Sequence, residues 1–158
     1  YRLWVQQGFI TATEGDVVDT DYLSKDIERI FHLYRVKNLT YDPWMATNGV
    51  IQHLEKVGYY NILDPIAQTI TYLSEPTKDL QKRLQRRELD LMNNPVLRWM
   101  FRNVAIYTDP NMNIRLNKAK STEKIDGCAA SVNAIAGYIS KMASIREAYA
   151  GGREIKII

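Results

Sequence analysis

The sequence predicts one domain of the α/β or α+β class, because segments with helical spacing alternate along the chain with short apolar runs. Its 158 residues are 46% hydrophobic and 25% charged, which suits a globular domain with a single core. No internal repeat, low-complexity tract or linker divides the chain. We therefore expect residues 1–158 to form one unit.

In the first half of the chain, helices are predicted where apolar residues recur at every third or fourth position, and strands where short apolar runs meet turn residues. The predicted elements are an extended segment at 9–13, a helix at 20–34, a strand at 39–41, a helix from Pro43 to Gly58 and a strand at 59–63. Glycine is a common residue just after a helix, so Gly58 marks the end of the second helix.

In the second half, Ser74 can cap a helix that carries Pro76 in its first turn, and Asn94 with Pro95 is a good start for a short helix. The remaining predicted elements are strands at 104–108 and 112–116 around the turn at 109–111, a long helix from 121 to about 148 and an edge strand at 154–158. The long helix has an apolar stripe formed by Ile125, Cys128, Val132, Ile135, Ile139 and Met142.

The bulk properties exclude several classes of protein. The formal net charge of +3 permits a polyanionic partner without requiring one. The single cysteine excludes an internal disulfide and a cysteine-rich zinc site, and no apolar run is long enough to span a membrane. We expect a soluble, cytoplasmic protein. Because the chain starts at Tyr1 without a methionine, we also expect a piece of a longer polypeptide.

Asp42 is the first candidate for chemistry, because it ends the strand predicted at 39–41. In an α/β sheet, ligands bind beyond the carboxyl ends of the strands. A plainer alternative stays open at this point: an aspartate before Pro43 and a helix is an ordinary N-cap.

Asp126 is the second candidate, because it shares one face of the long helix with Ala130, Asn133 and Gly137. Small residues let a helix approach a sheet closely, and a carboxylate sheltered there needs a cation or a full set of hydrogen bonds. The alternative is an exposed first-turn acid, which the helix dipole favours by about 0.3–1 kcal/mol. Two carboxylates that converge from a strand end and a helix could bind a divalent cation.

The cations fall into two groups that could hold a phosphate backbone beside such a pair of acids. One group lies at a spacing of four residues in the segment 78–87, and the other approaches Asp126. The candidate DNA-binding residues are Lys82, Arg86, Lys118, Lys120 and Lys124. The alternative is a solvated helix face.

Other catalytic arrangements fit the sequence less well. His32 and His53 lack the spacing of metal ligands, and Cys128 lies on the apolar stripe, where an inert core thiol is expected. A glycine-rich phosphate loop is also missing from the sequence.

The chain resembles the C-terminal nuclease domain of tailed-bacteriophage terminase large subunits over nearly its whole length. The most specific matching blocks are residues 94–100 (Asn-Pro-Val-Leu-Arg-Trp-Met) and 118–127 (Lys-Ala-Lys-Ser-Thr-Glu-Lys-Ile-Asp-Gly). Further matching blocks, in the same order as in the family, are 4–9 (Trp-Val-Gln-Gln-Gly-Phe), 15–19 (Gly-Asp-Val-Val-Asp), 41–44 (Tyr-Asp-Pro-Trp) and 74–78 (Ser-Glu-Pro-Thr-Lys).

The resemblance implies an α/β, RNase H-like nuclease fold with a mixed sheet flanked by helices. It implies an endonuclease that cuts concatemeric double-stranded viral DNA during packaging in the host bacterial cytoplasm, with Mg²⁺ or Mn²⁺ held by acids that match Asp42 and Asp126. It further implies the portal and the small terminase subunit as partners.

In the family, a first acid lies on an opening strand that would precede Tyr1, and the ATPase domain lies further upstream. We therefore expect an N-terminally incomplete nuclease domain that lacks its first strand, has an unpaired sheet edge, and cuts poorly or not at all. Two alternatives remain open: a non-catalytic DNA-binding or portal-docking fragment of the same protein, and a different RNase H-like enzyme such as a junction resolvase.

Overall fold

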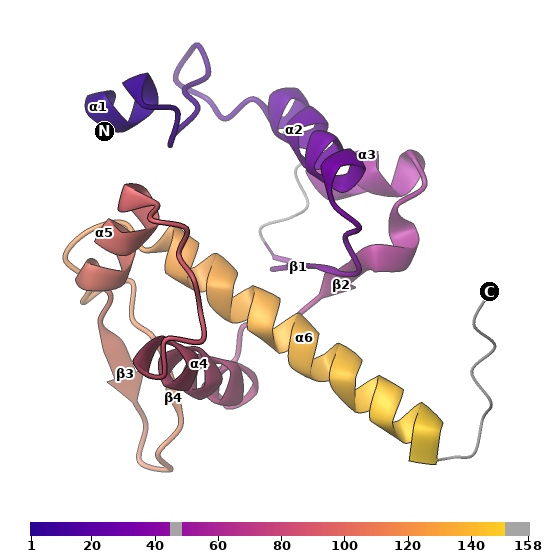
Figure 1. Ribbon diagram of the computed structural model, residues 1–158, viewed down its shortest axis with the longest axis vertical. Helices are drawn as coiled ribbons and strands as arrows, with labels where there is room; N and C mark the ends of the chain where they lie inside the picture. Colours follow the sequence, from indigo (N-terminus) through magenta and orange to yellow (C-terminus); the bar gives the residue numbers. More distant parts are fainter. Residues whose placement is uncertain (45–48, 151–158) are drawn as a thin grey trace.

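The computed structural model describes residues 1–44 and 49–150, and these form a mixed α/β domain, as the sequence predicts (Figure 1). The strands form two small sheets, one of β1 (Leu39–Tyr41) and β2 (Leu63–Pro65), the other of β3 (Ile106–Thr108) and β4 (Ile114–Leu116). The first pair is parallel and the second antiparallel. The long helix α6 (Asp126–Ala150) runs between the two sheets, and the other elements are arranged around it.

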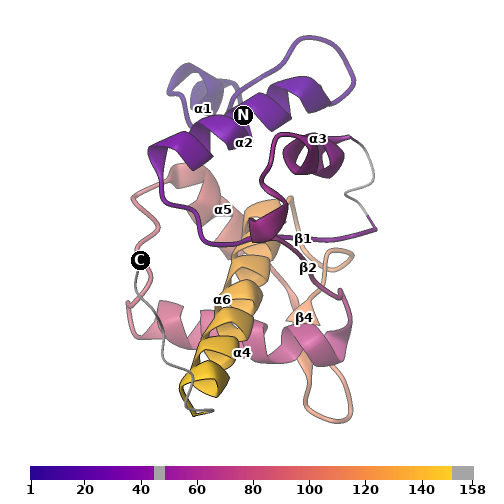
Figure 2. The same ribbon diagram turned by 90° about the vertical axis from the view of Figure 1, so that its right-hand side faces the viewer.

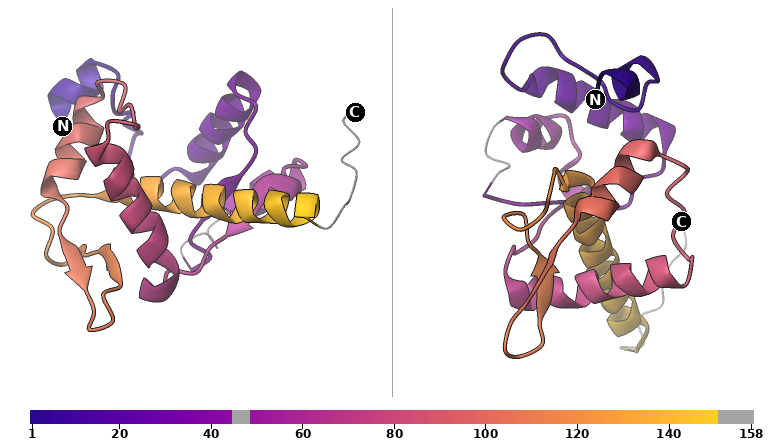
Figure 3. Two further views of the ribbon diagram at one scale, coloured as in Figure 1. Left: turned by 60° about the horizontal axis from the view of Figure 1, so that its bottom comes forward. Right: turned by 90° about the vertical axis from the view of Figure 1, so that its left-hand side faces the viewer.

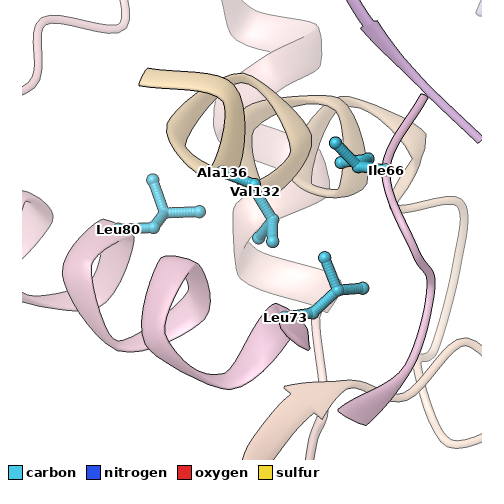
Figure 4. Close-up of a cluster of buried hydrophobic side chains, with 5 residues drawn as sticks. All are labelled: Ile66, Leu73, Leu80, Val132 and Ala136. Carbon is cyan, nitrogen blue, oxygen red and sulfur yellow. The ribbon is translucent and has the colours of Figure 1, made fainter. Parts of the chain in front are cut away.

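The core lies where α4 (Ile70–Gln85) crosses the first half of α6. Figure 4 shows Leu73 and Leu80 of α4 facing Val132 and Ala136 of α6, with Ile66 closing the cluster from the segment after β2. Each of these side chains is at most 9% exposed. The alanine lets the two helices approach closely, so a small side chain at this position favours the crossing.

Gly137 places α6 directly on β1. A Cβ atom at this position would collide with Cγ2 of Thr40 and lie 2.9 Å from Nδ2 of Asn38. Only glycine therefore permits this approach, and the predicted close contact between the small residues of the long helix and the sheet is confirmed here.

Three helices gather at one end of the molecule: α1 (Arg2–Gln6), α2 (Thr20–Leu33) and α3 (Val50–Lys56) (Figure 2). The predicted helix at 20–34 is confirmed, with Asp19 accepting a hydrogen bond from the Tyr22 N–H as its N-cap. Helices α2 and α3 are joined by a 2.6 Å contact between His53 Nε2 and Glu28 Oε1.

The predicted helix that starts at Asn94 is also confirmed, as α5 (Pro95–Asn103). The side chain of Asn94 accepts hydrogen bonds from the N–H groups of Val96 and Leu97. Strands β3 and β4 then form the predicted hairpin, whose turn is held by Asp109. Its carboxylate accepts a hydrogen bond from the Asn113 side chain, which lowers the pKa of Asp109 most, and the backbone N–H groups of Asn113 and Asn111 also donate to it and lower the pKa further.

Some predicted boundaries in the first half are wrong. The segment 9–13 is not a strand, and the ordered element near the N-terminus is α1. Most of 59–63 forms a 3₁₀ turn, η1 (Tyr60–Ile62), so β2 starts only at Leu63. Of the helix expected from Pro43, residues 43 and 44 form a turn, residues 45–48 lie outside the described residues, and α3 starts at Val50 after Gly49 with its φ of 89°.

In the second half, the prediction for Ser74 is wrong, because α4 begins earlier and is capped by Thr69. Proline in a helix interior costs about 3 kcal/mol, which is why Pro76 suggested a first turn. Instead Pro76 is buried inside the helix, and Ser74 accepts a hydrogen bond from the Ile114 N–H. The long helix begins at Asp126 rather than 121, and the strand predicted at 154–158 lies outside the described residues.

Candidate active site

Asp42 directly follows β1 and points toward α6. Side chains alternate along a strand, so Asp42 shares the face of Asn38 and Thr40, the residues packed against Gly137. Its carboxylate is half-buried and accepts a 3.0 Å hydrogen bond from the Trp44 N–H. The N-cap alternative is wrong, because no helix in the described residues starts at Pro43.

Asp42 lines a cavity of about 490 Å³ between β1, α4, α6 and the segment after β4. The polar groups around this cavity are Gln68, Arg115, Asn117, Lys118 and Asn133. Carboxylate and amide oxygens with room for water suit a hydrated Mg²⁺ or Mn²⁺ ion, which prefers oxygen ligands and keeps several waters. The chemistry of Asp42 and these amides suits such an ion, whereas Arg115 and Lys118 bring positive charge to the same cavity.

Asp126 is the first residue of α6, and its side chain is 66% exposed. It lines a separate cavity of about 340 Å³ formed by Lys118 and residues 121–126. Lys118 Nζ lies 3.4 Å from Asp126 Oδ1. This exposure agrees with the alternative of a first-turn acid favoured by the helix dipole, since the sheltering provided by Gly137 lies three turns further along α6.

The two aspartates thus line neighbouring cavities, and Lys118 lines both of them. Asn133, which lines the cavity of Asp42, is seven residues from Asp126 along the same helix, a rise of about 10 Å. Among residues 1–44 and 49–150, no group of three or more His, Cys, Asp or Glu side chains is placed to hold a metal ion.

Asp126 is positioned by the packing of α6 on α5. A Cβ atom on Gly127 would lie 2.7 Å from Leu97 Cδ1 and 2.8 Å from Met100 Sδ, so the start of α6 sits close against α5. The Gly127 N–H also lies 3.1 Å from Met100 Sδ. The two most specific sequence blocks therefore meet in space, and together they fix the end of α6 that carries Asp126.

The five candidate DNA-binding cations occupy two different places. Lys118 and Lys124 line the cavity of Asp126, and Lys120 lies between them in the sequence, where its N–H bonds to Asn117 Oδ1. Lys82 lies on α4, and Arg86 is the C-cap residue that follows this helix. Lys82 lines a different cavity between α4 and the second half of α6, and Arg86 Nη1 lies 3.8 Å from Glu88 Oε1.

Sequence reasoning gave no role to three polar residues on this face. Asn117 and Asn133 line the cavity of Asp42. Their side-chain amides, which offer oxygen ligands, are the sequence signal that could have identified them as site residues. Asp64 pairs in register with Thr40 but is held by Asn38 Nδ2 at 3.0 Å and lines another cavity, beside Lys141.

Cys128 lies in the core, as its place on the apolar stripe predicts. The side chain is fully buried, and burial raises the pKa of the Cys128 thiol to about 11. A neutral, inaccessible thiol cannot act as a nucleophile. His53 contacts Glu28, and His32 lies on the exposed surface of α2.

Comparisons with known proteins identify the family to which this chain belongs. Residues 1–141 match the family model of the terminase large subunit, endonuclease domain. The chain therefore belongs to the terminase large-subunit nuclease family. None of the helices in the described ranges is long and apolar enough to cross a membrane.

Particular relatives agree with this assignment. The chain is 27% identical over 139 residues to "Protein YmfN" of Escherichia coli (strain K12), covering 85% of this chain and 30% of that protein. It is 24% identical over 144 residues to "Terminase, large subunit" of Enterobacteria phage HK97, covering 89% of this chain and 28% of that protein. The chain thus spans less than a third of the length of these relatives.

The solved structure of the HK97 bacteriophage large terminase matches the fold with a TM-score of 0.78 at 22% identity. The match covers 86% of this chain and 28% of the terminase chain. The observed α/β arrangement is therefore that of a terminase nuclease domain, with its RNase H-like fold.

Proposed function

We propose that this chain is the nuclease portion of a DNA-packaging terminase large subunit, acting on concatemeric double-stranded viral DNA in the host bacterial cytoplasm. One observation supports this proposal most. Asp42 lies just beyond the carboxyl end of β1 and lines a polar cavity. Lys118 lines both this cavity and the cavity of Asp126. The family membership supplies the reaction class, an endonuclease.

The proposed cofactor is Mg²⁺ or Mn²⁺. Asp42 would hold it together with the amide oxygens of Asn117 and Asn133. Asp126 lines the neighbouring cavity and would hold an ion there. When bound, the metal would supply a nucleophilic water and stabilise charge on a phosphodiester. A family member with a full set of acids could hold two such ions.

The cations beside the aspartates would position the DNA. Lys118 and Lys124 line the cavity of Asp126, and Lys120 lies between them in the sequence, so the three could neutralise backbone phosphates and fix the register of the duplex. Lys82 and Arg86 lie on another element, so the phosphate-binding role proposed here falls on the three lysines.

We further propose that the chain binds metal weakly and cuts DNA slowly. Two carboxylates in neighbouring cavities are a small ligand set, and the exposed side chain of Asp126 already has Lys118 beside it. An ion at Asp126 must displace this lysine, and an ion at Asp42 meets a single carboxylate, so the affinity at either place should be low.

Calorimetric titration of the 158-residue chain with MnCl₂ tests this proposal. Asp42→Asn should weaken manganese binding by about tenfold or more, and Asp126→Asn should weaken it less, because that carboxylate is largely exposed. Asp16→Asn, which changes an exposed loop acid, is the matched control and should leave binding unchanged. Manganese binding that is equal in wild type and Asp42→Asn would exclude Asp42 as a ligand.

Plasmid nicking provides the second readout. Rapid manganese-dependent nicking that Asp42→Asn abolishes would support the nuclease but contradict the predicted low activity. Nicking that is slow, metal-dependent and abolished by Asp42→Asn is the expected result.

A second candidate function is a non-catalytic DNA-binding or portal-docking fragment of the same protein. The exposed Lys118–Asp126 pair favours it, since an acid paired with a lysine needs no metal. Such a module would bind duplex DNA with an affinity that falls with salt and does not respond to manganese. Portal and small terminase subunit remain proposed partners in either case.

A further inference from the structure

A large open cavity of about 880 Å³ lies between α4 and the second half of α6. A neighbouring cavity of about 590 Å³ continues along the same two helices, and both are lined by Thr71, Glu75 and Ile139. We call the two together the α4–α6 groove. None of its lining residues lines the cavities of Asp42 or Asp126, so the groove is separate from the candidate active site.

One part of the groove is basic. Four cations, Lys78, Lys82, Arg83 and Arg146, line it against two acids, Glu75 and Asp79, which leaves two positive charges in excess. The guanidinium of Arg83 already has two partners. Its Nε donates a 2.8 Å hydrogen bond to Asp79 Oδ2, and the group lies over the ring of Tyr138. Lys78 Nζ donates to the carbonyl of Met112 at 2.9 Å.

The remaining two cations lie on opposite walls of the groove. Lys82 comes from α4 and Arg146 from the last turns of α6, and both side chains are exposed. Within the described residues, neither makes an ion pair with an acidic side chain. The excess charge therefore sits on two cations that line an open cavity of about 880 Å³.

The rest of the lining is apolar. Ile139, Met142 and Ala143 of α6 line the same cavity as the basic side chains, and Pro76 and Ala136 line the neighbouring cavity. Methionine and isoleucine side chains adapt to an inserted apolar residue. The groove thus combines an apolar surface with cations on both walls.

We propose that the α4–α6 groove docks an acidic segment of another protein, whose carboxylates pair with Lys82 and Arg146 and whose apolar side chain packs on Ile139 and Met142. Charge complementarity selects this occupant. A DNA duplex presents phosphates on a convex rod but no apolar group for Met142 and Ile139. Peptide recognition in a groove, by contrast, uses apolar anchors in addition to charged contacts.

Selection from a library of short random peptides displayed on phage tests the proposal with the 158-residue chain as bait. Enriched peptides should contain several Asp or Glu residues and at least one Leu, Ile, Met or Phe. The most enriched peptide, labelled with fluorescein, is then titrated by fluorescence anisotropy. The double variant Lys82→Glu/Arg146→Glu should weaken its binding by about tenfold or more.

The matched control is Lys25→Glu/Lys56→Glu, which makes the same change in net charge on α2 and α3 and should leave the affinity unchanged. Hydrogen exchange of the wild-type chain gives a readout that does not depend on any variant. Bound peptide should protect residues within 71–83 and 138–146.

Three outcomes would overturn the proposal. Enriched peptides could lack acidic residues, or they could bind the groove variant as tightly as wild type. Alternatively, a short DNA duplex could bind the groove variant more weakly than wild type while the peptide binds both equally well. This result would make the groove a nucleic-acid surface. None of these results depends on nuclease activity, so the groove and the proposed cleavage site are tested separately.

Discussion

The two halves of α6 face different surroundings, although they belong to one continuous helix. In the first half, Gly127 lies against α5, Val132 and Ala136 pack on α4, and Gly137 rests on β1. In the second half, most side chains from Tyr138 onward are exposed, and one side lines the α4–α6 groove. Figure 3 shows the ribbon of this half extending away from α5 and the hairpin of β3 and β4. The first half is therefore clamped on three sides, and the second has one open side.

This difference separates the half of α6 that positions the proposed metal ligands from the half that borders the proposed docking groove. The clamped half carries Asp126 at its start and Asn133 beside Asp42, so the proposed ligands are fixed by close helix packing. A site on rigid elements keeps its geometry. The open half can exchange water for a partner without disturbing that packing. Substitutions in the two halves should consequently have different effects on folding.

The largest expected difference comes from placing a carboxylate in each half. Val132 is 2% exposed, so Val132→Asp buries an unpaired charge and should lower the free energy of unfolding by about 3–5 kcal/mol. Ile145 is 36% exposed, so Ile145→Asp can keep its charge in water and should cost less than about 1 kcal/mol. Urea unfolding followed by circular dichroism measures both. Equal losses in the two variants would show that the halves are packed alike.

A second comparison separates the two glycine contacts within the clamped half. Gly137→Ala drives a methyl into Thr40, a β-branched residue on a strand that cannot rotate away, and should cost about 1–3 kcal/mol. Gly127→Ala meets only the flexible ends of Leu97 and Met100, which can move, while alanine favours the helix by about 0.5–1 kcal/mol. Thermal unfolding should therefore rank Gly137→Ala well below Gly127→Ala. A reversed order would mean that α5, not β1, sets the position of α6.

Much of the fold could be predicted from local signals. The cap at Asn94, the helix at 20–34 and the strand at 39–41 follow from residue types that act on their own neighbours. The start of α4 could not be predicted this way. Pro76 is a strong local signal for a helix start, but tertiary packing buries it inside the helix, and Ser74 bonds to a strand forty residues away.

For the candidate site, the sequence predicts residues but not their arrangement. Of the face formed by Asp126, Ala130, Asn133 and Gly137, only Gly137 is packed against the sheet, whereas Asp126 and Ala130 are exposed. The same pattern could not show that Asp126 lies at an exposed helix end, because exposure depends on where α5 stops covering α6. The role of the two aspartates in metal binding stays a prediction.

The smallest expected effect concerns the reactivity of a thiol in each half. Burial raises the pKa of Cys128 to about 11, and the negative charge of Asp126 adds a smaller increase. At about pH 8, roughly one thiol in a thousand would be ionised, and the side chain is fully buried, so Ellman's reagent should not modify native Cys128. Because the folded pKa lies above the unfolded value of about 8.5, the neutral thiol stabilises the fold below that pH, and this contribution falls as the pH rises toward 11. Ala143→Cys places a second thiol in the open half, at an exposed position, and that thiol should react readily. Two thiols modified at similar rates in the native protein would mean that the first half of α6 opens as freely as the second, and the distinction between a clamped and an open half would fail.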